Sequence, residues 1–146
     1  MISTNFKTAN LPWHQHTEYW ISLFARGGTF TPNLQQALKD AGMQFLSPGV
    51  MVVKTDAHWK KAWDAIYIAL QQINAAHMVE VSIIPGEQSP HTQTRSDNKS
   101  VGDIQKIADG MWLGDAILEN RILCYLQPVV SSRDKIFGYE SFARVR

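Results

Sequence analysis

The sequence has one cysteine, almost no net charge and no long apolar run. Because there is no second cysteine, an internal disulfide is excluded. We expect a reducing, cytoplasmic location, with Cys124 as a small core residue rather than a nucleophile. The formal net charge of +1 gives no basis for binding a nucleic-acid polymer or an anionic membrane. No stretch approaches the roughly 18 consecutive apolar residues of a membrane span, and the first residues lack a signal-peptide pattern. The sequence therefore predicts a soluble protein.

The composition is that of an ordinary globular protein, 45% apolar and 18% charged. A chain of 146 residues can form one domain, or one small domain and part of another. The polar stretch at residues 89–100 has little to bury and is expected to be a linker or exposed loop. We therefore divide the chain into a unit at 1–88, this linker and a C-terminal segment at 101–146.

Residues 1–88 show the pattern of a compact α+β unit after an irregular lead-in at 1–16. The expected elements, in order, are a strand, a helix capped by Thr31 and stopped by Gly42, a hairpin, a helix capped by Asp56, and a strand. The three strand regions are Tyr19–Phe24, Phe45–Val53 and Met78–Ile84. The second helix is the best defined, because its apolar residues recur at steps of three and four: Trp59, Ala62, Trp63, Ile66, Leu70 and Ile73.

Two motifs in this unit are weak indicators of chemistry. His14 and His16 could share a strand face and bind a metal, but no Cys or carboxylate accompanies them at a useful spacing, and structural zinc takes four ligands. The run Arg26–Phe30 superficially resembles the Gly-Gly-Asp-Glu-Phe signature of diguanylate cyclases. Its acidic pair is absent, so we reject cyclase activity and expect a turn at the two glycines.

The C-terminal segment begins with a helix and continues with two strand-like runs. An amphipathic helix is expected over Asp103–Glu119, with an apolar stripe of Val101, Ile104, Ile107, Ala108, Met111, Trp112 and Ala116. The apolar run from Arg121 to Val130 and the alternating run from Ile136 to Arg146 are joined by a five-residue polar connector. Such a short link favours an antiparallel hairpin, since parallel strands need a crossover of a dozen or more residues.

Glu140 is a candidate site residue on the second strand. Side chains alternate between the faces of a strand, so Glu140 shares a face with Gly138, Phe142 and Arg144. A carboxylate between apolar neighbours on a central strand is costly to desolvate unless a cation lies nearby. The alternative is an ordinary exposed pair of Glu140 and Arg144, which contributes little. Spacing alone leaves both interpretations open.

The segment between Leu113 and Arg144 contains several features in a fixed order. A helix ends just before an apolar strand that carries Tyr-Leu-Gln-Pro-Val-Val at Tyr125–Val130. A short hairpin then leads to Gly-Tyr-Glu and to an Arg four residues beyond the Glu. This order resembles the opening of an EAL domain, the family of bacterial cyclic di-GMP phosphodiesterases and their non-catalytic relatives. The signature tripeptide reads Glu140-Ser141-Phe142 here, so only its acidic residue is kept.

The resemblance implies a fold and a set of site residues. EAL domains are (β/α)8 barrels whose first strand is antiparallel to the others, so the overall prediction is an α/β protein: an α+β N-terminal unit followed by the opening helix and hairpin of such a barrel. By this resemblance Glu140 would bind Mg²⁺ or Mn²⁺, while Gln127 and Arg144 would hold cyclic di-GMP. Hard divalent cations favour carboxylate oxygen, and a guanidinium suits phosphate. In active members two such ions activate a water that hydrolyses cyclic di-GMP to pGpG.

The resemblance also implies that the barrel is incomplete in this chain. The later strands of the family carry further acidic ligands and a lysine, so we expect a fragment truncated after the first two barrel strands. It has no catalytic residue of its own and does not hydrolyse cyclic di-GMP alone. The unit at 1–88 is then a regulatory or input unit. Two alternatives remain: a non-catalytic cyclic di-GMP receptor, or a protein-interaction or sensory module. A homodimer or contact with the missing barrel would cover the exposed apolar strands.

Overall fold

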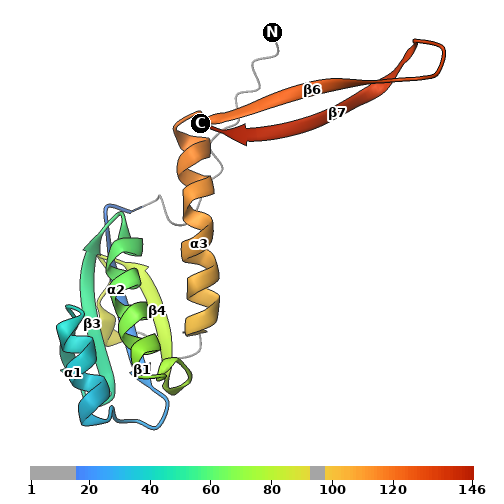
Figure 1. Ribbon diagram of the computed structural model, residues 1–146. Helices are drawn as coiled ribbons and strands as arrows, with labels where there is room; N and C mark the ends of the chain where they lie inside the picture. The colour runs from blue at the N-terminus through green and yellow to red at the C-terminus, as the bar shows by residue number, and fades with distance from the viewer. Residues whose placement is uncertain (1–15, 93–97) are drawn as a thin grey trace. The chain divides into compact units, whose positions relative to one another are not determined.

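The computed structural model describes residues 16–92 and 98–146 (Figure 1). The chain divides into two compact units within one helix, α3 (Val101–Leu118): an N-terminal unit that ends at Gly110 and a C-terminal unit, Met111–Arg146. Each unit is described by itself. None of the helices in the described ranges is long and apolar enough to cross a membrane.

The N-terminal unit is an antiparallel sheet with two helices. Its strands have the order β2-β3-β1-β4-β5 in the sheet. The connectivity from β1 to β4 is the βαββαβ arrangement of ferredoxin-like folds. The α+β character predicted from the sequence is confirmed. The elements are β1 (Glu18–Ala25), α1 (Pro32–Asp40), β2 (Gln44–Ser47), β3 (Val50–Asp56), α2 (Trp59–Gln72), β4 (Val79–Pro85) and β5 (Lys99–Ser100), with 3₁₀ turns η2 (Ala76–Met78) and η3 (Pro90–Thr92).

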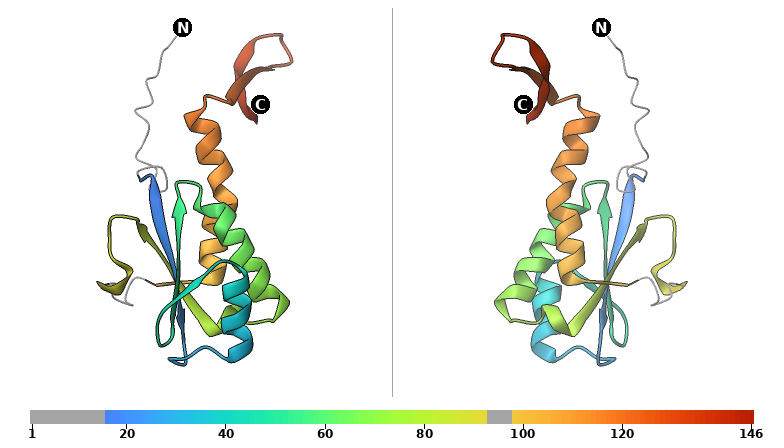
Figure 2. Two further views of the ribbon diagram at one scale, coloured as in Figure 1. Left: turned by 90° about the vertical axis from the view of Figure 1, so that its left-hand side faces the viewer. Right: turned by 90° about the vertical axis from the view of Figure 1, so that its right-hand side faces the viewer.

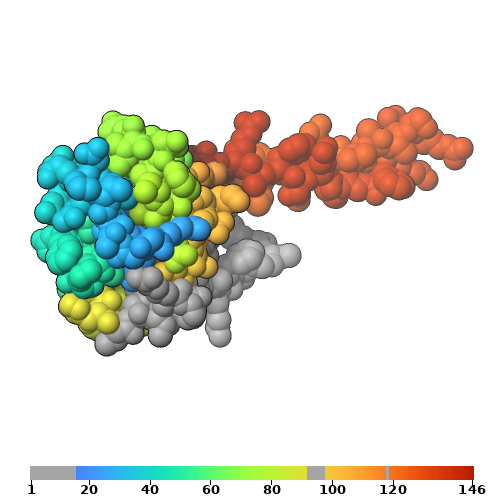
Figure 3. Space-filling model, turned by 90° about the horizontal axis from the view of Figure 1, so that it is seen from below, coloured from blue at the N-terminus to red at the C-terminus, as the bar shows by residue number. Residues whose placement is uncertain are grey.

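Both helices lie on one face of the sheet (Figure 2), and atoms of α1 lie next to those of α2 (Figure 3). Helix α1 begins as predicted: Thr31 Oγ1 accepts a hydrogen bond from the Leu34 N–H over 3.3 Å, and Pro32 occupies the first turn. Gly42 follows the helix with φ +99°, a conformation that favours glycine.

Helix α2 buries Trp59, Trp63, Ile66 and Leu70, so most of the predicted apolar stripe is confirmed. Ile73 is the C-cap residue that follows the last turn of the helix, and it is 41% exposed. The predicted N-cap is wrong. Asp56 is the last residue of β3, and its carboxylate accepts a hydrogen bond from the His58 N–H over 2.8 Å. His58 is the N-cap, with no side-chain capping bond.

The core of the N-terminal unit lies between the sheet and the helices. The fully buried strand residues include Ile21 and Leu23 on β1, and large buried neighbours on the adjacent strands and helices are Leu38, Met51, Trp63, Ile66, Leu70, Val79 and Val81. The indole N–H of Trp63 donates to Gln105 Oε1 over 2.8 Å, which connects α2 to the first half of α3. A satisfied indole lets a large aromatic residue anchor the core.

The stretch expected to be a linker, residues 89–100, has regular structure at both ends. Its start contains η3, and its end is β5, which pairs with Glu80 and Val81 of β4. The short strand β5 pairs with part of the edge of β4, where the backbone N–H and C=O groups would otherwise be unpaired. Residues 93–97 lie outside the described part of the chain, as do residues 1–15 of the expected lead-in and therefore His14.

The C-terminal unit contains an antiparallel hairpin, as predicted. Strands β6 (Ile122–Val130) and β7 (Ile136–Val145) form a two-stranded sheet. The Ser131 N–H donates to the Lys135 carbonyl over 2.8 Å and closes the turn. Two burial predictions are wrong: Cys124 is exposed, and Trp112 of α3 is 57% exposed. Cys124 lies on a strand that pairs only with β7 in the described part of the chain, and all residues of that strand are half-buried or exposed.

Candidate functional site

The hairpin register brings the predicted site residues to one face. Gln127 on β6 lies directly opposite Glu140 on β7, and Arg144 lies opposite Leu123. The pairing is regular from Ile122 to Val129, so the alternation of side chains is unbroken through this region. Gln127, Glu140 and Arg144 therefore point to the same side of the hairpin.

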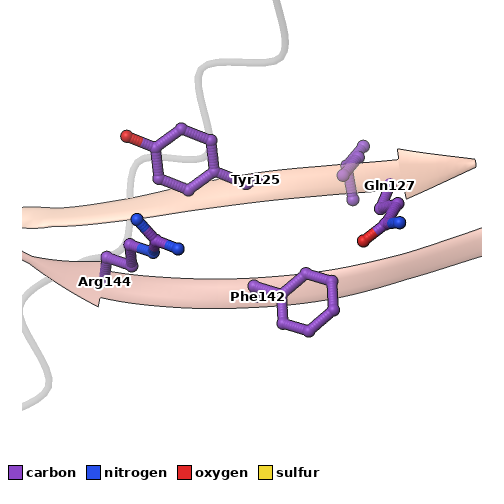
Figure 4. A pocket seen from close by; sticks show the side chains of 5 residues that line it. Tyr125, Gln127, Phe142 and Arg144 are labelled. Carbon is purple, nitrogen blue, oxygen red and sulfur yellow. The ribbon is translucent and has the colours of Figure 1, made fainter.

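An open hollow lies between the two strands, and four of its five lining residues belong to this face (Figure 4). Its volume is about 280 Å³, and it is lined by Tyr125, Leu126, Gln127, Phe142 and Arg144. The Arg144 side chain extends toward β6, where its guanidinium carbon is 5.7 Å from the centre of the Tyr125 ring. This distance is typical of a cation–π contact. The hollow thus combines one cation, one amide and two aromatic rings.

Sequence reasoning missed Tyr125 and Phe142 as residues of this site. They are direct cross-strand partners, and the two rings are 50% and 42% exposed. Period-two alternation gives the face of each residue within its own strand, but the pairing across the hairpin requires the register. The irregularity between Val129 and Val130 shifts that register near the turn.

Glu140 is an exposed carboxylate, and its pair with Gln127 is the next pair on the same face after Tyr125 and Phe142. An exposed carboxylate oxygen is accessible to a divalent cation. In the ranges 16–92 and 98–146, however, no group of three or more His, Cys, Asp or Glu side chains is arranged to hold a metal ion. Glu140 supplies one carboxylate on this face, and holding two ions would need further ligands.

The other motifs singled out in the sequence have structural roles. His16 Nδ1 lies 2.8 Å from Glu87 Oε1, and its ring meets the edge of Tyr19. The pKa of the Tyr19 hydroxyl is raised above its ordinary value, mainly because the group is buried. A hydrogen bond with the His16 backbone partly lowers this pKa, and the negative charge of Glu87 raises it. Gly28 has φ +86° and donates its N–H to the Ala25 carbonyl over 3.0 Å, as expected of a turn.

Comparison with models of known families, with curated proteins and with solved structures gives no match to this chain.

Proposed function

We propose that the C-terminal segment is the opening of an EAL domain and that the chain acts in cyclic di-GMP signalling in the cytoplasm, as part of a phosphodiesterase. The observation that supports this most directly is the shared hairpin face of Gln127, Glu140 and Arg144, with the first two directly opposite each other. The motif order in the sequence is matched by a helix followed by an antiparallel hairpin.

Each of the three side chains has a chemical role in this proposal. The Glu140 carboxylate is a ligand for Mg²⁺ or Mn²⁺, since hard cations prefer oxygen ligands. The Arg144 guanidinium is a donor for phosphate, and the Gln127 amide offers both a donor and an acceptor to the dinucleotide. When bound in a complete domain, the ions supply an activated water. A single carboxylate cannot hold two ions, so we propose binding without hydrolysis by these 146 residues.

Titration of the ¹⁵N-labelled chain with cyclic di-GMP tests the binding. We expect amide shifts concentrated at Gln127, Glu140 and Arg144 and their neighbours on β6 and β7, with the N-terminal unit unchanged. Incubation with cyclic di-GMP and Mn²⁺, followed by chromatography, should give no pGpG. The absence of hairpin shifts at millimolar ligand would refute the proposed function, and accumulation of pGpG would refute the proposed lack of hydrolysis.

A non-catalytic receptor is the second candidate. The observation that favours it is that Phe142, which departs from the family's tripeptide, lines the hollow beside Arg144. The two candidates differ in their dependence on metal. Binding that persists unchanged in EDTA and in the Glu140→Gln variant supports a receptor, whereas binding that requires Mn²⁺ and Glu140 supports kinship with the phosphodiesterases.

A further inference from the structure

We propose that Tyr125 and Phe142 form a stacking platform for a purine base of the bound dinucleotide, with Arg144 facing the adjoining phosphate. This inference rests on the proposed function and adds the part of the ligand that the hairpin recognises. The motif assigns no role to either aromatic ring, and the family's tripeptide has leucine at the position of Phe142.

The two rings are placed on opposite strands around one hollow. Tyr125 and Phe142 are direct partners in the register, and each ring is about half exposed. Figure 4 shows them directed away from each other, one on the β6 side and one on the β7 side, with Gln127 and Arg144 between them and along the same face. The two rings therefore border the hollow of about 280 Å³, one on its β6 side and one on its β7 side.

The chemistry of these side chains suits a base joined to a phosphate. Aromatic faces stack with nucleobases in proteins that bind single strands, and every base has a π-face that can take part. Arg144 lies over the Tyr125 ring, so its orientation is set by that contact while its guanidinium edge remains available to a phosphate oxygen. Larger purine rings overlap the platform more than pyrimidines do. A leucine at position 142 would lack the aromatic face.

Base selectivity of the unmodified chain is the first test. Cyclic di-GMP and cyclic di-UMP have the same cyclic phosphate backbone and differ in their bases. We expect cyclic di-GMP to bind about fivefold more tightly in the amide-shift titration, because a purine overlaps the rings more than a pyrimidine does and differences in stacking strength give modest base preferences. Equal affinity for the two dinucleotides would overturn the platform.

Substitution of the rings is the second test. Phe142→Leu and Tyr125→Leu should each lower the ratio of the two affinities toward one, and Phe142→Leu restores the leucine of the family's tripeptide. Tyr139→Leu is the matched control, because Tyr139 is an exposed aromatic residue of the same strand on the opposite face. The control should keep the ratio of the unmodified chain.

The ratio of the two affinities distinguishes recognition of the base by the rings from a change in the stability of the hairpin. A substitution that only loosens the hairpin weakens both dinucleotides equally and leaves the ratio unchanged, an outcome that would overturn the platform. If cyclic di-GMP does not bind the unmodified chain, the proposed function itself fails. If it binds but the Leu variants behave like Tyr139→Leu, the proposed function stands and the platform alone is refuted.

Discussion

Trp63 shows how one polar contact supports a buried aromatic residue. The side chain is fully buried, and its indole N–H donates to the Gln105 side-chain oxygen over 2.8 Å. Leaving a buried donor unpaired costs more than forming the bond contributes, because the donor loses its hydration and gains no partner. Gln105 therefore stabilises the N-terminal unit by satisfying the Trp63 indole N–H.

We predict that Gln105→Leu destabilises the chain by about 1–3 kcal/mol, the cost of an unsatisfied buried group. Urea unfolding followed by tryptophan fluorescence measures this change. Gln36→Leu is the control, because Gln36 makes a hydrogen bond of similar length, 2.8 Å to Asp40, at an exposed position. We expect the control to change stability by no more than about 0.5 kcal/mol. Equal effects of the two substitutions would contradict the role given to Gln105.

At the scale of single residues, the sequence could predict the contacts that are local. The Thr31 cap and the buried stripe of α2 follow from spacing along one helix. The Asp56 cap was wrong, because an Asp close to a helix start can equally end the preceding strand and bond the backbone two residues on. The Trp63–Gln105 bond joins residues far apart in the sequence, so no local pattern indicates it.

At the scale of elements, two glycines illustrate opposite constraints. Gly49 lies in the turn between β2 and β3 with φ +73°, and a Cβ there would fall within van der Waals overlap of the Gly28 carbonyl oxygen. Gly110 lies in the interior of α3 and is exposed, and a Cβ at this position would meet no described atom within 4 Å beyond the neighbouring residues and backbone of its own helix. The first glycine is required by the turn, whereas the second only weakens its helix.

We therefore predict opposite signs for the two alanine substitutions. Gly49→Ala should destabilise by about 2 kcal/mol or more, from the left-handed backbone and the clash with Gly28. Gly110→Ala should stabilise by up to about 1 kcal/mol, since alanine is the better helix former. Urea midpoints of the two variants measure both effects. The same sign for both would show that the local backbone does not control stability at these positions.

For the hairpin, the sequence pattern predicts the faces of the strands but not the register between them. Alternation indicated that Glu140 and Arg144 share a face, and the short polar connector indicated antiparallel strands. Which residue of β6 lies opposite Glu140 depends on the turn and on the irregularity between Val129 and Val130. A shift by one residue moves every side chain to the other face, so Tyr125 and Phe142 could not be paired from sequence alone.

At the scale of the whole molecule, the two units differ in how their strands are supported. Strand β1 is flanked by β3 and β4 and contributes fully buried residues to the core. Strands β6 and β7 pair only with each other in the described part of the chain, and Phe137 is 87% exposed. A lone two-stranded hairpin is marginally stable in water.

We predict that amides of β1 are among the slowest in the chain to exchange with deuterium and that those of β6 and β7 exchange much faster. Local stability follows buried contacts, which the hairpin lacks. Saturating cyclic di-GMP should slow exchange in β6 and β7, because a ligand that binds the folded hairpin stabilises it by mass action. Hydrogen exchange followed by NMR measures both. Hairpin amides as protected as those of β1 without ligand would contradict this prediction.

For the molecule as a whole, the order of elements from β1 to β4 was predictable from turn residues and hydrophobic periodicity. The role of Lys99 and Ser100 was not, because two residues that complete the edge of a sheet carry no periodic signal. The boundary between the two units could not be predicted from the sequence either, since it lies within one uninterrupted helix, α3.

The exposure of Cys124 has a practical consequence. It is the single cysteine of the sequence, and by strand alternation it projects from the side of β6 opposite to Tyr125 and Gln127. A maleimide fluorophore or a nitroxide spin label would therefore attach at one known position, on the face opposite to Tyr125, Gln127 and Arg144. A decrease in the mobility of the probe when a nucleotide is added would then report binding on the opposite face of the hairpin.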